Sequence, residues 1–142
     1  MLFVLLRMFS GFEEEWKSDQ NVFLEANGDF TYHGLFFEFS SYFQDHFQEM
    51  NPQKIQELCD YIEQFVRDDS KNESDDNVHD SIDNAICTCF LEHVGRNPDW
   101  DNSWYQTPSQ KEELLRETTM YAELPKYLGP KSIKFYSNWH KT

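Results

Sequence analysis

Apolar residues recur every three or four positions along most of this chain, which is the spacing of residues on one face of an α-helix. The pattern is clearest from residue 77 to residue 94. One face of this segment carries Val78, Ile82, Ala85, Ile86, Cys89, Phe90 and Val94, and Gly95 follows as a predicted helix end. Cys87 and Leu91 extend the apolar surface sideways, so we expect this helix to lie at the centre of the fold.

Two further helices have recognisable start signals. Asn51 before Pro52 combines a favoured capping residue with a first-turn residue that needs no N–H donor. Thr107 and Gln110 have the spacing of a capping box, in which each side chain accepts a hydrogen bond from the other residue's backbone N–H. These signals and the apolar spacing predict helices over residues 2–9, 11–17, 32–47, 52–66, 77–94, 108–123 and 130–139.

The N-terminal helices are expected from fewer signals. Ser10 and Glu13 have capping-box spacing and would begin the helix over residues 11–17. Residues 1–8 are weakly constrained, and their apolar run is too short for the core of a signal peptide. No stretch of the sequence is long and apolar enough to be a transmembrane helix.

Length and composition favour a single helical domain that spans residues 1–142. A chain of 142 residues has about the commonest size of one domain, and 17% of these residues are aromatic. Aromatic rings bury large areas, so this chain does not belong with disordered acidic proteins. Residues 68–76 contain no apolar side chain and are expected to form an acidic solvated loop. The expected fold is all-α, a single irregular bundle of six to seven short helices.

Charge is unevenly distributed along the chain. Glu57 to Asp83 contains ten carboxylates and two cations, whereas Leu124 to Thr142 contains four lysines and no acid. The net charge of -14 should repel nucleic acid and attract basic proteins. The three cysteines cannot all pair, which favours reduced thiols and a cytoplasmic location.

The segment from Asp99 to Tyr105 places three aromatic rings among carboxylates. It begins like a calcium-binding loop, but Trp104 occupies the position that requires glycine and Gln110 the position that requires glutamate. Large aromatic residues ringed by charge are typical of binding interfaces. The alternative is that these rings fold back as a lid over the core.

Asp76, Asp80 and Asp83 lie along the first turns of the central helix, where the helix dipole stabilises carboxylates. We favour a solvated helix face, and the alternatives are an acidic patch that faces a partner and a hydrolytic carboxylate pair. With the acidic loop and the aromatic segment, the residues expected to contact a basic partner are Asp68, Asp69, Asp75, Asp76, Asp80, Asp83, Asp99, Trp100, Asp101, Trp104 and Tyr105.

The sequence gives little support for catalysis. No serine or cysteine stands in a nucleophile-elbow context, and the five glycines form no phosphate-binding loop. Cys89 and His93 are four residues apart on a predicted helix and could bind a metal together with Cys59. The alternative, which we favour, is that the thiols are small buried apolar groups. We therefore expect no catalytic residue, no metal and no cofactor.

Three stretches carry a resemblance to a known family. They are His33 to Phe43, the sequence NAICTCFLE over residues 84–92, and the sequence YLGPKS over residues 127–132. Across residues 31–132 the chain resembles a family of small, acidic, uncharacterised bacterial proteins of helical type. Similar proteins are suspected of acting as immunity partners of secreted toxins. The resemblance implies a helical fold and a protein partner, and it brings no catalytic residue with it.

The net charge, the aromatic segment and the family resemblance together predict a non-enzymatic, cytoplasmic immunity protein. It would bind and neutralise a basic toxin, such as a nuclease. Nuclease clefts are positive because they hold phosphate, so an acidic protein would associate quickly and compete with substrate. We expect a monomer or weak dimer that binds no nucleic acid and no membrane. The alternative function is an acidic adaptor or nucleic-acid mimic that binds several basic cellular proteins.

Overall fold

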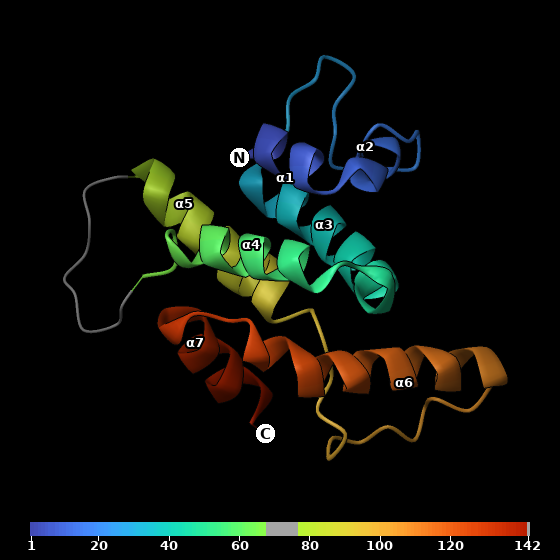
Figure 1. Cartoon of the computed structure of the whole chain (residues 1–142). Coiled ribbons are helices and arrows are strands. Elements are labelled where there is room, and N and C mark those ends of the chain that lie inside the picture. The colour runs from blue at the N-terminus through green and yellow to red at the C-terminus, as the bar shows by residue number, and fades with distance from the viewer. Residues whose placement is uncertain (68–76, 142) are drawn as a thin grey trace.

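The computed structural model describes residues 1–67 and 77–141, and Figure 1 shows that they form helices joined by loops. The helices are α1 (Leu2–Met8), α2 (Ser10–Trp16), α3 (Tyr32–His46), η1 (Phe47–Glu49), α4 (Pro52–Glu63), α5 (Asn77–Ala85), η2 (Ile86–Leu91), α6 (Pro108–Glu123), η3 (Leu124–Lys126) and α7 (Pro130–His140). No strand occurs in either described range. The prediction of an all-α bundle of short helices is confirmed.

Aromatic rings from α3 and η2 meet at the centre of the bundle. Phe36, Phe39 and Phe43 follow one face of α3, and their ring centroids are 6.3, 5.8 and 5.2 Å from that of Phe90. All four side chains are fully buried, and burying one such side chain contributes about 1.5–3 kcal/mol. The surrounding core cluster includes residues from every helix between α1 and α7. In Figure 1, α1 and α2 lie on one side of this centre and α6 and α7 on the other.

The central helix differs from its prediction in its geometry and in its end. The apolar spacing favours a single α-helix over residues 77–94, but α5 gives way to the π-helix η2, which ends at Leu91. In a π-helix the N–H groups bond to carbonyls five residues back, as between Glu92 and Cys87 at 3.1 Å. This wider turn allows Phe90 and Leu91 to be fully buried together with Ile86. The apolar surface is therefore broader here than one α-helical face.

Two of the predicted helix starts have the expected hydrogen bonds. Asn51 accepts from the Gln53 N–H at 2.8 Å, ahead of Pro52 at the first turn of α4. Thr107 and Gln110 make both bonds of a capping box, at 3.1 and 3.0 Å. Both predictions are confirmed, because the signal in each case involves residues within one helical turn.

The capping box predicted at Ser10 is wrong. α2 begins at Ser10 itself, and Phe9 occupies the preceding position without a side-chain cap. Phe9 is buried, with its ring 5.5 Å from that of Phe39, and this packing fixes where the chain passes from α1 into α2. Glu13 instead pairs with Lys17 at 2.6 Å.

The start of α7 is capped by a residue from a different helix. The Glu63 carboxylate, at the end of α4, accepts hydrogen bonds from the N–H groups of Lys131 and Ser132 at 3.0 and 2.9 Å. The Ser132 hydroxyl donates to the same carboxylate at 2.7 Å. A Cβ at Gly129 would lie 2.6 Å from the Glu63 side chain, so glycine leaves the space that this side chain fills. These contacts fasten α7 to α4.

Candidate protein-binding surface

The aromatic loop, residues 96–105, is tied to the core by its first residues. It begins where Gly95 turns the chain with a φ of 84°. Buried Asn97 donates to the His140 carbonyl at 2.7 Å and accepts from the Asp99 N–H at 2.8 Å. The Arg96 N–H donates to the Glu117 carbonyl of α6 at 3.0 Å. The loop therefore rests on α6 and on the last turn of α7.

The guanidinium of Arg96 lies among the three aromatic rings that the sequence singles out. Its central carbon is 5.2, 5.8 and 5.4 Å from the ring centroids of Trp100, Trp104 and Tyr105. Arg96 also donates to the Asn102 side chain at 2.6 Å and to a main-chain carbonyl of the loop at 2.9 Å. A cation–π contact at an exposed site contributes about 0.5–1 kcal/mol. Arg96 thus organises the loop from within.

The three rings differ in how much of each a partner could reach. Tyr105 is 6% exposed, and its hydroxyl donates to Glu117 at 2.7 Å. Trp100 stacks on His140, with ring centroids 5.6 Å apart. Trp104 lies over Tyr105 yet remains 53% exposed. Tyr105 is therefore part of a lid over the core, and Trp104 is the ring that is most available for contact.

Glu117 is a buried carboxylate that the sequence interpretation overlooks. Besides the Tyr105 hydroxyl, it accepts a hydrogen bond from Gln44 of α3 at 3.1 Å, and Gln44 accepts from the Gly95 N–H at 2.9 Å. Burial raises the pKa of Glu117. A signal for it exists, because Glu117 stands three residues before buried Met120 and so shares its helix face.

The predicted acidic residues lie in different surroundings. Asp99 and Asp101 are exposed on the aromatic loop. The Asp83 carboxylate accepts hydrogen bonds from the Arg67 N–H at 3.0 Å and from the Cys87 thiol at 3.7 Å, so it joins the segment after α4 to α5. Asp68, Asp69, Asp75 and Asp76, together with the side chain of Asp80, lie outside what the structure describes.

A second acidic feature lies between the end of α3 and α6, and the sequence interpretation does not include it. This acidic groove has a volume of about 350 Å³ and is lined by Asp45, Gln48, Glu49, Glu112, Leu115 and Arg116. Leu115 is 65% exposed, so the groove offers apolar contact as well as three carboxylates. Its two walls are more than sixty residues apart in the sequence, and local patterns do not bring them together.

The alternative metal site does not assemble in the described part of the chain. There, no three His, Cys, Asp or Glu side chains come together in a way that could hold a metal ion. Cys59 is fully buried, and burial raises its pKa to about 12, which keeps the thiol protonated. Cys89 belongs to the π-helix η2, His93 lies beyond its end, and the His93 ring lies 5.3 Å from that of Phe37.

The fold and this surface define a small, acidic, all-α protein with an exposed tryptophan on a well-held loop. The chain belongs to the DUF7674 family, a domain of unknown function, whose family model matches residues 4–141. No match was found among curated proteins or among solved structures. Of the helices in the described ranges, none has the length and apolar content that crossing a membrane would require.

Proposed function

We propose that this protein is a non-enzymatic binding protein that holds a basic partner against Trp104 and the carboxylates around it. The observation that carries the proposal is the 53% exposure of Trp104 on a loop that is already held in place. Asp99 and Asp101 are exposed on the same loop. A large ring beside carboxylates suits the arginine and lysine side chains of a basic surface, which combine a charge with an apolar stem.

The internal contacts of the aromatic loop support a role in binding. Arg96 and Tyr105 fix the loop before a partner arrives, so fewer side chains lose rotamer freedom when the complex forms. The acidic groove lies on the helix that follows the loop, and it provides Leu115 as a second apolar contact. Carboxylates on both features would add to the attraction of a basic partner.

We further propose that the partner is a bacterial toxin and that this protein is its immunity protein. The choice of partner follows from the resemblance to proteins suspected of this role. Nucleases are the favoured class of toxin, because the positive cleft that holds phosphate would also attract the acidic surface described above. Binding there would exclude the nucleic-acid substrate from the cleft.

The first test is co-purification of the tagged protein from its native host, followed by mass spectrometry and a growth-rescue assay. We expect one basic partner whose toxicity the protein neutralises. Trp104→Ala should weaken binding of that partner by about tenfold or more, because anchoring aromatic residues dominate interface energies. Trp139→Ala is the matched control, since Trp139 is a second exposed tryptophan, 47% exposed, and belongs to α7 rather than to the aromatic loop.

The charged residues of the loop call for a kinetic measurement. Asp99→Asn combined with Asp101→Asn should lower the association rate constant and flatten its dependence on salt, with a smaller effect on dissociation. Equal losses for the Trp104 and Trp139 variants would contradict the proposed surface. Several unrelated basic partners of similar affinity would instead favour the acidic adaptor.

A further inference from the structure

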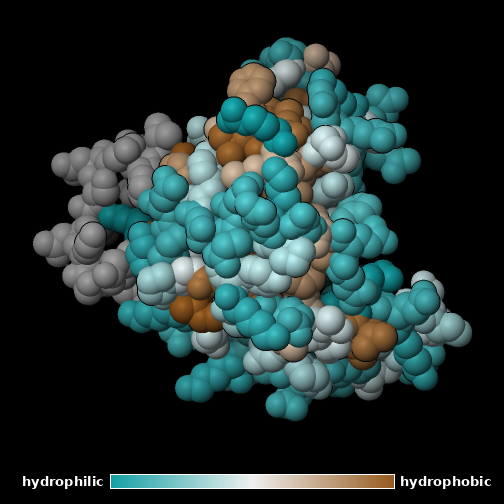
Figure 2. All heavy atoms as spheres, viewed as in Figure 1, coloured by the Kyte–Doolittle hydropathy of each residue, from teal (hydrophilic) through white to brown (hydrophobic). Residues whose placement is uncertain are grey.

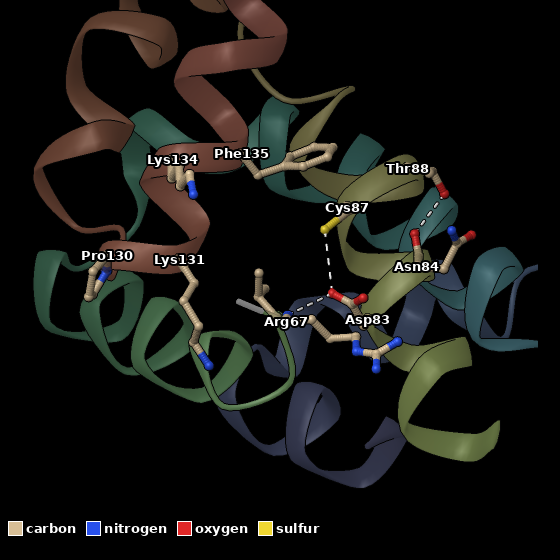
Figure 3. A pocket seen from close by; sticks show the side chains of 10 residues that line it. Arg67, Asp83, Asn84, Cys87, Thr88, Pro130, Lys131, Lys134 and Phe135 are labelled. Atoms are coloured by element: carbon tan, nitrogen blue, oxygen red, sulfur yellow. Dashed lines mark hydrogen bonds between the residues drawn. The ribbon is translucent and has the colours of Figure 1, made fainter. Parts of the chain in front are cut away.

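An apolar groove of about 500 Å³ opens between α1, α2 and the segment that follows α2. Its apolar lining consists of Leu2, Phe3, Leu6, Trp16 and Leu24. In Figure 2, apolar side chains gather over this part of the molecule, at the top of the view. No described residue lines both this groove and the pocket that Figure 3 shows between α7 and the continuous helix α5–η2.

The first helix, α1, is apolar on both of its faces. Arg7 is its one polar residue. Leu5 is fully buried in the core, whereas Phe3, which points about 200° away from it on a helix, is 82% exposed. A helix that is apolar all round is normally buried all round. We therefore expect the outer face of α1 to be covered by another molecule.

The shape of this face matches a second copy of the same chain. Phe3 protrudes at the groove, while Trp16, which is 2% exposed, lies at the bottom of it. Two copies that meet about a two-fold axis present the same patch to each other, so each feature of the patch must fit another feature of that patch. A protruding ring beside an apolar groove meets this condition, because the ring of each copy can enter the groove of the other.

The charges on this face also suit a second copy. The charged residues in the described lining are Arg7, Lys17 and Glu13, so both signs are present on a chain whose net charge is -14. Lys17 pairs with Glu13 at 2.6 Å, whereas Arg7 makes no hydrogen bond or ion pair with any described residue. Acidic surfaces of two copies would repel each other, and a face of mixed sign is where they can approach.

We propose that this groove is the interface of a two-fold symmetric dimer. Phe3 of each copy fills the groove of the other, and Arg7 lies beside a carboxylate of the other copy. The proposal does not depend on the proposed function. The aromatic loop rests on α6 and α7, which lie on the other side of the bundle from α1 and α2 (Figure 1), so each copy keeps its loop exposed.

Sedimentation velocity of the full chain at concentrations from about 1 μM to about 1 mM tests the proposal. We expect a monomer–dimer equilibrium that tightens about fivefold or more when NaCl is raised from about 0.15 M to about 1 M, because salt screens the repulsion between two acidic copies. A chain that stays monomeric at all concentrations would overturn the proposal. Assemblies larger than a dimer would also overturn it, since a two-fold contact leaves no copy of the patch free.

Variants and amide shifts locate the contact. Phe3→Asp should weaken dimerisation by about tenfold or more, because it removes apolar contact and adds a like charge to each copy. Circular dichroism should show unchanged helix content, since this side chain is 82% exposed. Trp139→Ala removes an exposed ring on α7 and should leave dimerisation unchanged. Equal losses in the two variants, or backbone amide shifts of Leu6 and Leu24 that do not change on dilution, would overturn the proposal.

Two further measurements examine the charge and the other occupant of the groove. Arg7→Glu should weaken dimerisation more at about 0.15 M than at about 1 M NaCl, because it makes the face acidic like the rest of the chain. The same loss at both salt concentrations would overturn the proposed role of Arg7. Vesicles of phosphatidylcholine should not bind the protein in a flotation assay. Vesicle binding by a chain that forms no dimer would assign the groove to a lipid surface and overturn the proposal.

Discussion

Single hydrogen bonds to buried side chains decide how firmly the aromatic loop is held. Glu117 is 9% exposed and accepts one bond from Tyr105 and another from Gln44. A buried carboxylate that loses a donor bears the full cost of its removal from water. Trp104 lies over Tyr105 and near the Arg96 guanidinium, so its position depends in part on this bond between two residues that a partner does not reach.

Tyr105→Phe should therefore destabilise the fold by about 1–3 kcal/mol, because it removes the donor to Glu117 and leaves a carboxylate oxygen short of a partner. Urea unfolding followed by circular dichroism measures the change. Tyr61→Phe is the control, since the Tyr61 hydroxyl has no hydrogen-bond partner among the described residues. A loss of the same size in both variants would show that the Tyr105 hydroxyl has no special role.

His140 should make the stability of the protein depend on pH. The ring is fully buried, Nε2 donates to the Leu91 carbonyl at 2.9 Å, and burial lowers the pKa from its usual 6.5. The unfolded chain then binds a proton at this residue more readily than the folded chain does. The contribution of His140 to stability is therefore fully present above about pH 6.5 and is lost as pH falls from there toward the lower folded-state pKa.

Denaturant unfolding at a series of pH values, compared between the wild type and His140→Gln, measures this contribution. Glutamine keeps an N–H donor for the Leu91 carbonyl but does not titrate. The difference between the two proteins is informative because buried carboxylates such as Glu117, whose pKa is raised, favour the folded state as pH falls. Parallel profiles for the two proteins would rule out His140 as the source of the pH dependence.

At the scale of elements, local signals predict where most helices begin and end. Thr107 and Gln110 cap α6 as their spacing indicates, because all participating groups lie within one turn. The π-helix and the Glu63 cap are different. Glu63 is 68 residues from Lys131, and it accepts a hydrogen bond from the Lys131 N–H group at the start of α7. The wide turn of η2 carries Phe90, which packs against Phe43 of α3. Neither contact is visible to a pattern that compares neighbours along the chain.

The capping of α7 by Glu63 can be tested with Gly129→Asp, whose effect on stability should change sign when Glu63 is removed. Glu63→Ala should destabilise the protein by about 1–3 kcal/mol, because charge-assisted bonds to the start of α7 are lost. Gly129→Asp should also destabilise the wild type, since its Cβ would lie 2.6 Å from the Glu63 side chain. In the Glu63→Ala background, however, the same aspartate can cap α7 locally and should restore stability.

Thermal unfolding of the four proteins in this cycle gives the coupling energy. The expected result is a double variant that is more stable than Glu63→Ala alone. Additive losses would show that Glu63 and Gly129 act independently and that the cap does not position α7.

At the scale of the whole molecule, the excess of negative charge is the dominant electrostatic fact. Figure 2 shows a face that is hydrophilic over most of its area, with separate apolar patches. The ion pairs among described residues, such as Lys17 with Glu13 and Lys126 with Glu123, are exposed and contribute little to stability. Repulsion among the remaining carboxylates is therefore largely uncompensated.

Salt should consequently stabilise this protein. Raising NaCl from about 0.01 M to about 1 M shortens the screening length from about 30 Å to about 3 Å, and the melting temperature should rise by several degrees. Replacing the exposed Glu14, Asp19 and Glu25 by their amides should reduce the increase. A melting temperature that falls with salt would mean that attractive pairs outweigh the repulsion.

The sequence predicts the charge of the proposed binding surface better than it predicts where that surface lies on the fold. Net charge predicts a basic class of partner, and of the three aromatic rings predicted to contact it, the structure leaves Trp104 exposed. The acidic groove is not predictable in this way, because Asp45 and Glu112 meet only through the packing of α3 on α6. The roles of Arg96 and Glu117 likewise depend on contacts that the fold creates.

The unequal exposure of the tryptophans gives this protein a built-in optical reporter. Trp16 is 2% exposed, whereas Trp104 and Trp139 are 53% and 47% exposed. Indole fluorescence shifts to longer wavelength in water, so in a Trp139→Phe variant the red edge of the emission spectrum would come mainly from the aromatic loop. A partner that covers Trp104 would shift this emission to the blue, and complex formation could be followed in solution without a dye.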